Sequence, residues 1–225
     1  MSPSTVIRAV VFDLDGVIID SEEVWEEVRR GYVAEYGKQF LPDSQDRMMG
    51  MSTPEWSRHL AEEVGVPRTG EQVASDVLGR MASRYRSDLP LIPGSVAAVR
   101  RLGERFTLAL ASSSARVLID QVLATAGLTD AFAVTLSTEE VPRGKPAPDV
   151  YLAATGKLGL TPPECAAIED SSNGLRSAAA AGTHVIAVPR PEYPPAADAL
   201  ARAELVLDDL DQLTVAKVAA LSQPS

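Results

Sequence analysis

The chain has 225 residues, 45% of them hydrophobic and 23% charged, which is typical of a stable globular protein and excludes a disordered chain. Its 21 basic and 31 acidic residues give a net charge of −10, which disfavours nucleic acid and anionic membranes as partners. Cys165 is the single cysteine, no apolar run approaches the roughly 18 residues of a membrane span, and MSPSTVIRAV lacks a signal-peptide pattern, so we expect a cytoplasmic protein.

The first predicted element is a strand at Val6–Phe12, which ends in the residues DLDG. Its β-branched and aromatic residues occupy consecutive positions, as is typical of a strand covered on both faces in a parallel sheet. Asp13 and Asp15 follow the strand directly, separated by one leucine. Gly16 then allows a sharp turn away from the strand, because glycine adopts backbone angles that other residues avoid.

The pattern changes between Ser21 and Leu89, where strand-like runs vanish and helical stripes appear. One such stripe consists of Val24, Val28, Tyr32 and Tyr36. Apolar residues at this spacing fall on one face of a helix. We therefore expect residues 21–89 to form a small helical domain inserted into a core domain of residues 1–20 and 90–225.

From Thr107 onward, strand-like runs alternate with helical segments, many of which end at glycine. The predicted strands are Thr107–Ala111, Ala131–Leu136, Ala166–Ile168 and His184–Val188, with a weaker edge strand at Glu204–Leu207 before a closing helix. This alternation predicts an α/β fold with a Rossmann-like, parallel-sheet core.

Polar residues collect where these strands end. Parallel strands present their carboxyl ends at one edge of the sheet, and ligands bind there. The residues at or near these ends are Asp13, Asp15, Ser112, Ser113, Ser114, Lys145, Glu169 and Asp170. We expect these side chains to lie close together.

Several carboxylates at one sheet edge repel each other unless a cation bridges them or one of them is protonated. Oxygen ligands in this number suggest Mg²⁺, which takes one or two protein carboxylates and keeps water or phosphate in its other positions. A lysine and serine hydroxyls near helix N-termini supply what a phosphate group needs. The set therefore predicts a phosphoryl-transfer site.

Four motifs in this order, DLDGV, ASSS, GKPAPD and IEDSSNG, resemble the signature motifs of the haloacid dehalogenase superfamily. The helical insertion after the first motif resembles the cap of the subgroup that contains β-phosphoglucomutase and sugar-phosphate phosphatases. The resemblance covers nearly the whole chain, and it implies a Mg²⁺-dependent enzyme acting on small phosphorylated metabolites.

The resemblance also implies roles for individual residues. Asp13 would be the nucleophile that becomes an aspartyl phosphate, and Asp15 the general acid and base. Ser112 and Lys145 would hold the phosphoryl oxygens. The metal would be bound by the side chain of Asp13, the backbone carbonyl of Asp15, the side chain of Asp170 and, in or near its coordination shell, Glu169.

The aspartate at position 15 disfavours a dehalogenase, since the carbon–halogen hydrolases of the family lack this residue. Mutases of the subgroup carry a histidine and an arginine where this chain has Trp25 and Thr53, which argues against a mutase. The pattern DSE-x-x-W instead resembles phosphatases that act on hexose or hexitol phosphates. The residues expected to face the leaving group are Glu22, Trp25, Met51, Ser52, Thr53, Ser113, Ser114 and Arg116.

Other interpretations stay open. Trp25 and Met51 could simply pack inside the insertion, Glu22 could be a favourable first-turn acid, Arg116 could be surface charge, and Glu169 could lie behind the metal ligands. For the whole chain the alternatives are a phosphosugar mutase and a non-catalytic ligand-binding protein of this fold. We expect a monomer whose partner is a small phosphorylated metabolite.

Overall fold

The computed structural model describes residues 6–41, 43–48 and 51–221, and it contains one six-stranded sheet in which all neighbouring strands are parallel. The strands are β1 (Ala9–Phe12), β2 (Thr107–Ser112), β3 (Val134–Ser137), β4 (Cys165–Glu169), β5 (His184–Ala187) and β6 (Leu205–Val206). Their order is β3-β2-β1-β4-β5-β6, which puts β1 in the centre. The prediction of an α/β fold with a parallel sheet is confirmed.

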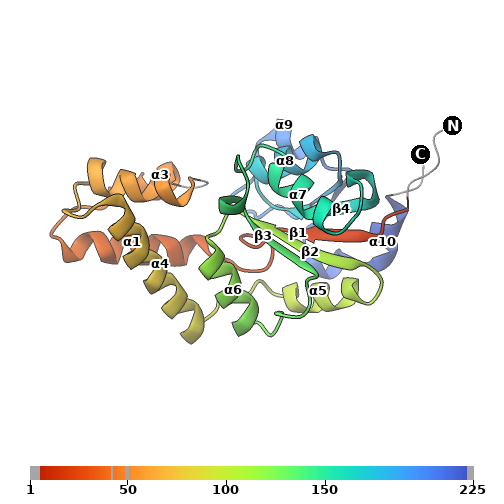
Figure 1. Ribbon diagram of the computed structural model, residues 1–225, viewed down its shortest axis with the longest axis horizontal. Helices are drawn as coiled ribbons and strands as arrows, with labels where there is room; N and C mark the ends of the chain where they lie inside the picture. Colours follow the sequence, from red (N-terminus) through yellow and green to blue (C-terminus); the bar gives the residue numbers. More distant parts are fainter. Residues whose placement is uncertain (1–5, 42, 49–50, 222–225) are drawn as a thin grey trace.

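Helices cover both faces of this sheet (Figure 1). They are α5 (Ser95–Gly103), α6 (Arg116–Thr125), α7 (Asp149–Lys157), α8 (Ser172–Ala181), α9 (Ala197–Leu200) and α10 (Val215–Ala220). Successive residues of β1 enter different cores: Val10 and Phe12 join a cluster with α5, α6 and α10, while Ala9 and Val11 join a cluster with α7, α8 and α9. This double burial explains why β1 is apolar at consecutive positions.

The chain between β1 and α5 is helical and lies beside the sheet (Figure 1). It contains α1 (Glu22–Glu35), α2 (Ser44–Met48), α3 (Thr53–Arg58), a π-helical turn at His59–Glu63 and α4 (Gly70–Ser87). Val24 and Tyr32 of the predicted stripe are buried on α1. The proposed domain limits stay a prediction, and residues 1–5, 42, 49–50 and 222–225 lie outside the described residues.

Two connections join this helical segment to the sheet, and they pair with each other. The backbone N–H of Asp20 donates to the carbonyl of Pro90 at 2.8 Å, and that of Ile92 donates to the carbonyl of Ile18 at 3.0 Å. Both connections therefore run together at the carboxyl end of β1. This arrangement brings the first turn of α1 to the edge of the sheet where the polar residues collect.

Among the described residues, no helix combines the length and the apolar character that a membrane crossing requires.

Candidate active site

The turn after β1 is built around a glycine that touches another strand end. Gly16 has a φ of 78°, a left-handed conformation that residues with a Cβ atom rarely adopt. A Cβ atom at this position would lie 1.8 Å from Oδ2 of Asp170, which follows β4. The glycine thus permits the close approach of the Asp13–Gly16 turn and the Asp170 carboxylate.

A buried ion-pair network connects the ends of β1 and β4. The ammonium group of Lys145 donates to Asp13 at 2.9 Å, to Glu169 at 2.6 Å and to the backbone carbonyl of Ala111 at 3.0 Å. The hydroxyl of Tyr151 on α7 also donates to Glu169 at 2.6 Å. The side chains of Lys145, Asp13 and Glu169 are 4%, 8% and 0% exposed, so these charges stabilise each other away from water.

Burial and mutual repulsion disfavour the charged forms of the carboxyl groups at this site. Burial, reinforced by the charge of Glu169, raises the pKa of Asp13 to about 8, although Lys145 opposes the shift. Burial and the charge of Asp13 likewise raise the pKa of Asp170 well above its usual range. The pKa of Lys145 is raised because Asp13 and Glu169 together outweigh the effect of its burial.

A divalent cation fits this cluster. Oxygens of Asp13, Glu169 and Asp170 lie within 4.8 Å of one another, which is suitable for a shared ion. Among the described residues, Oδ1 of Asp170 is buried without a hydrogen-bond partner, although buried carboxylate oxygens are normally satisfied. A cation would satisfy this oxygen and offset the repulsion among the three carboxylates.

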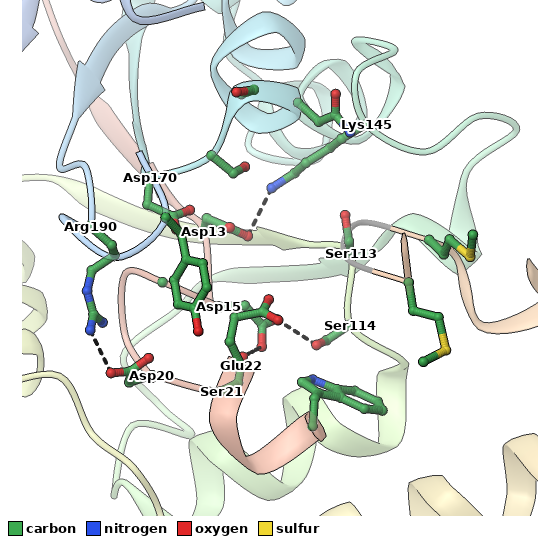
Figure 2. A pocket seen from close by; sticks show the side chains of 18 of the residues that line it. Asp13, Asp15, Asp20, Ser21, Glu22, Ser113, Ser114, Lys145, Asp170 and Arg190 are labelled. Atoms are coloured by element: carbon green, nitrogen blue, oxygen red, sulfur yellow. Dashed lines mark hydrogen bonds and ion pairs between the residues drawn. The ribbon is translucent and has the colours of Figure 1, made fainter. Parts of the chain in front are cut away.

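The carboxylate of Asp15 is held by hydroxyl groups from two parts of the chain. Ser21, just before α1, and Ser114, after β2, each donate to it at 2.6 Å (Figure 2). The hydroxyl of Ser112 lies 3.4 Å from it. Ser114 is positioned in turn, because its backbone N–H donates to Ser112 and its carbonyl accepts from Ser137. These contacts fix Asp15 two residues away from Asp13 but in a different hydrogen-bonding environment.

Residues from these groups border one cavity of about 460 Å³, which lies between the carboxyl edge of the sheet and the helical segment (Figure 2): Asp13, Asp15, Ser21, Ser114, Lys145 and Asp170. A volume of this size suits a small molecule. The predicted site residues that line it are Asp13, Asp15, Glu22, Trp25, Met51, Thr53, Ser113, Ser114, Lys145 and Asp170. The structure therefore brings together most of the residues that the motifs singled out.

The family model of the haloacid dehalogenase-like hydrolases matches residues 7–182, which is most of the chain. The chain belongs to this family. Hexitol phosphatase B of Escherichia coli K12 is 35% identical to it over 198 residues, which cover 85% of this chain and 88% of that protein.

Solved structures show the same fold. CbbY from Rhodobacter sphaeroides, crystallised with phosphate, has a TM-score of 0.81 at 26% identity over 94% of this chain and 99% of that one. A β-phosphoglucomutase from Clostridium difficile has a TM-score of 0.77 over 96% of this chain and 97% of that one. Its identity is only 22%, so this second likeness concerns the fold alone.

Four residues predicted for the site of this haloacid dehalogenase-like hydrolase do not line the cavity. Ser112 and Glu169 are fully buried behind it, where they contact Asp15 and Lys145. Ser52 instead forms a capping box at the start of α3, where its backbone N–H and its hydroxyl both donate to the carboxylate of Glu55. Of the serines that follow β2, Ser113 and Ser114 line the cavity, whereas Ser112 does not.

Arg116 also turns away from the cavity, contrary to the prediction that it faces the leaving group. Its guanidinium donates to Glu140 at 2.7 Å and to the backbone carbonyl of Thr135 at 2.9 Å. It therefore links the start of α6 to β3 and the following turn. The physical reason is that the carboxylate of Glu140 and the exposed end of β3 are nearer partners than the cavity.

The cavity wall of this haloacid dehalogenase-like hydrolase also contains residues that were not predicted for the site. They include Asp20, Arg29, Met48, Trp56, Arg190, Tyr193, Pro194 and Pro195. The proline-rich stretch at 189–195 predicts a loop, with a linker or partner motif as the alternative, and Arg190 within it donates to Asp20 at 2.6 Å (Figure 2). For Arg29 the only signal was its place four residues after Trp25, on the same face of a helix.

Proposed function

We propose that this protein is a Mg²⁺-dependent phosphatase that hydrolyses small phosphorylated metabolites, with sugar or polyol phosphates as its substrates, through an aspartyl phosphate at Asp13. The observation that supports this most directly is the position of Lys145, whose ammonium group lies 2.9 Å from the carboxylate of Asp13 at the cavity wall. A cation beside a carboxylate nucleophile attracts a phosphate dianion into an otherwise acidic protein.

In the proposed first step, a carboxylate oxygen of Asp13 attacks phosphorus and the bond to the leaving alkoxide breaks. Asp15, in its protonated form, gives its proton to the departing oxygen. In the second step Asp15 accepts a proton from water as that water attacks phosphorus, which releases inorganic phosphate and regenerates Asp13. The hydroxyls of Ser21 and Ser114 hold the Asp15 carboxyl in place for both transfers.

Lys145 supports both steps because it can contact phosphoryl oxygens while Glu169 and Tyr151 hold its position from behind. The metal would be bound by Asp13, Asp170 and the backbone carbonyl of Asp15, with Glu169 close by. When bound, Mg²⁺ would neutralise negative charge on the phosphoryl oxygens and help to orient them.

The proposal for sugar or polyol phosphates draws on two further points. The relative from Escherichia coli is named for hexitol phosphates. Trp25 and Thr53, which stand where the mutases of the subgroup have a histidine and an arginine, both line the cavity. The cavity therefore differs from a mutase site at the two positions that would control the returning sugar phosphate.

The test is phosphate release from hexose, hexitol, pentose, triose and nucleoside monophosphates, with Mg²⁺ and with EDTA. We expect turnover of sugar or polyol phosphates that requires Mg²⁺, and a loss of at least about 100-fold in Asp13→Asn. If Asp13→Asn kept more than a few per cent of activity, the covalent mechanism would be wrong. Bisphosphate-primed conversion of β-glucose 1-phosphate to glucose 6-phosphate that outpaces phosphate release would instead indicate a mutase.

A further inference from the structure

A cluster at the end of the cavity distant from the sheet combines one arginine with both tryptophans of the chain. The guanidinium carbon of Arg29 on α1 lies 4.4 Å from the ring centroid of Trp25 and 5.1 Å from that of Trp56 on α3. The two indole rings contact each other edge to face, with centroids 5.7 Å apart. Arg29 is only 4% exposed, yet it is part of the cavity wall.

Arg29 remains a cation in this position. Burial lowers the pKa of its guanidinium to about 10, but the nearby charge of Glu22 opposes the shift. The faces of the two indoles stabilise the planar guanidinium through cation–π contacts and restrict its orientation. Trp25 and Trp56 thereby restrict the N–H donors of Arg29 at the cavity wall.

A short stretch of chain connects this cluster to the proposed acid. Asp15, the proposed acid, accepts a hydrogen bond from Ser21 at 2.6 Å, and Glu22 is the next residue along the chain. Glu22, Trp25 and Arg29 all belong to α1, which begins at this point, and they line the same cavity as Asp13. A molecule whose phosphate contacts Asp13 and Lys145 would extend past Asp15 toward Arg29.

We infer that Arg29 is a specificity-determining residue, which with Glu22, Trp25 and Trp56 forms a subsite for an uncharged leaving group that carries several hydroxyls. This inference rests on the proposed phosphatase function. The guanidinium supplies donors and the Glu22 carboxylate supplies acceptors for hydroxyls, while the indole surface suits the C–H groups between them.

The charges around the cavity favour an uncharged leaving group over an anionic one. The cavity is bordered, among the described residues, by the carboxylates of Asp13, Asp15, Asp20, Glu22 and Asp170 and by the cations of Arg29, Lys145 and Arg190. The proposed Mg²⁺ would offset this acidic excess, but the phosphate dianion of the substrate would restore it, so a second anionic group on the substrate would be repelled and would face Glu22. Hydroxyl groups meet no such repulsion.

The inference is tested by measuring kcat/KM for a hexitol 6-phosphate and for ethyl phosphate, which has no hydroxyls, in Arg29→Met and Arg29→Lys. We expect Arg29→Met to lower kcat/KM for the hexitol phosphate by about 10-fold or more, since it removes charge-assisted hydrogen bonds, and to change that for ethyl phosphate by less than about threefold. Arg29→Lys should recover only part of the loss, because lysine lacks the planar group that stacks on the indoles.

Arg80→Met provides a matched control. Arg80 on α4 also stacks on an aromatic ring, that of Tyr32 at 4.9 Å, but it is not part of the cavity wall. It should leave both rates unchanged. Equal losses on the two substrates in Arg29→Met would overturn the inference, because they would show that Arg29 serves only the folding of the helical segment.

Tryptophan fluorescence separates this inference from the proposed function. Trp25 and Trp56 are the only two tryptophans in the chain, so the intrinsic emission reports on this cluster. In Asp13→Asn, titration with the hexitol 6-phosphate should change the emission saturably and inorganic phosphate should not, and adding Arg29→Met should weaken the binding.

If this emission change occurred but the wild type hydrolysed no ester, the proposed phosphatase function would be wrong, whereas the subsite would stand. Hydrolysis of the hexitol phosphate without the emission change would reject the subsite and keep the phosphatase.

Discussion

Single residues in the Lys145 network illustrate how strongly buried charges depend on each other. Lys145 neutralises Asp13 and Glu169 at once, and all three side chains are nearly inaccessible to water. Removing the lysine leaves two carboxylates buried side by side without a counter-charge, whereas removing the Tyr151 hydroxyl leaves the ion pairs intact. Removing the lysine should therefore cost more stability than removing the hydroxyl, and only the loss of the lysine leaves buried charges unpaired.

We predict that Lys145→Met lowers the free energy of unfolding by about 3–5 kcal/mol and abolishes phosphatase activity. Tyr151→Phe should cost about 1.5–3 kcal/mol, the range for one hydrogen bond to a charged group, and should keep most of the activity. Urea unfolding and phosphate release measure both effects. An unchanged urea midpoint for Lys145→Met would contradict the stabilising role of the ion pairs.

Cys165 gives a second prediction at this scale. It is fully buried at the start of β4, and burial raises the pKa of its thiol to about 12. Because only the thiolate reacts, a raised pKa means less reactive sulfur at any pH below that value. We expect iodoacetamide at about pH 8.5 to modify the unfolded protein in urea within minutes and the native protein far more slowly, as mass spectrometry would show. Equal rates would show that β4 opens readily.

Among the elements, the turn after β1 combines a left-handed backbone angle at Gly16 with a close contact. A residue with a Cβ atom in a left-handed conformation costs about 1–2 kcal/mol. Gly16 and Gly37 both have this conformation, with φ angles of 78° and 66°. A Cβ atom at Gly37 would meet no atom within 4 Å, whereas one at Gly16 would overlap the Asp170 carboxylate.

We predict that Gly37→Ala lowers the free energy of unfolding by about 1–2 kcal/mol and leaves activity unchanged. Gly16→Ala should be more destabilising and should lose most of its activity, because Asp170 must move away from Asp13. Thermal unfolding and kcat measure the two outcomes. Equal effects of the two variants on activity would indicate that the contact with Asp170 is unimportant.

The elements also show where local patterns mislead. The run Ala131–Leu136 was predicted as a strand, but β3 begins only at Val134. Ala131 instead closes a turn, with its N–H donating to the carbonyl of Leu128, and Phe132 is apolar because it packs against Phe12 in the core. An apolar run records burial, and burial alone does not distinguish a strand from a packed turn.

For the whole molecule, the proposed metal site links cation binding to stability. The site is formed by residues after β1 and after β4, so it exists only when the sheet is assembled. A ligand that binds only the folded state stabilises it in proportion to the logarithm of its concentration over Kd.

We predict that Mg²⁺ at about 100 times its Kd raises the free energy of unfolding by about 2.7 kcal/mol, and that Asp170→Asn removes this gain. Thermal unfolding with Mg²⁺ and with EDTA provides the measurement. Asp208→Asn, a change at an exposed carboxylate, serves as the control that should keep the full response. A Mg²⁺ response that survives in Asp170→Asn would place the ion elsewhere.

Patterns in the sequence are sufficient to predict the parallel sheet and the strand ends that carry Asp13, Asp15, Ser114 and Asp170. These features follow from local periodicity and from the rule that parallel strands end at the same edge. The position of Lys145 could be predicted as well, because its motif comes just before α7.

The rest of the cavity wall depends on contacts between segments that are distant in the sequence. Arg29 contacts two indoles from different helices, Arg190 pairs with Asp20 across 170 positions of the chain, and Arg116 turns to Glu140. A charged side chain adopts the direction in which its nearest partners lie, and those partners come from segments distant in sequence. Local spacing therefore identifies the strand ends, whereas packing between helices, loops and sheet determines which side chains reach the cavity.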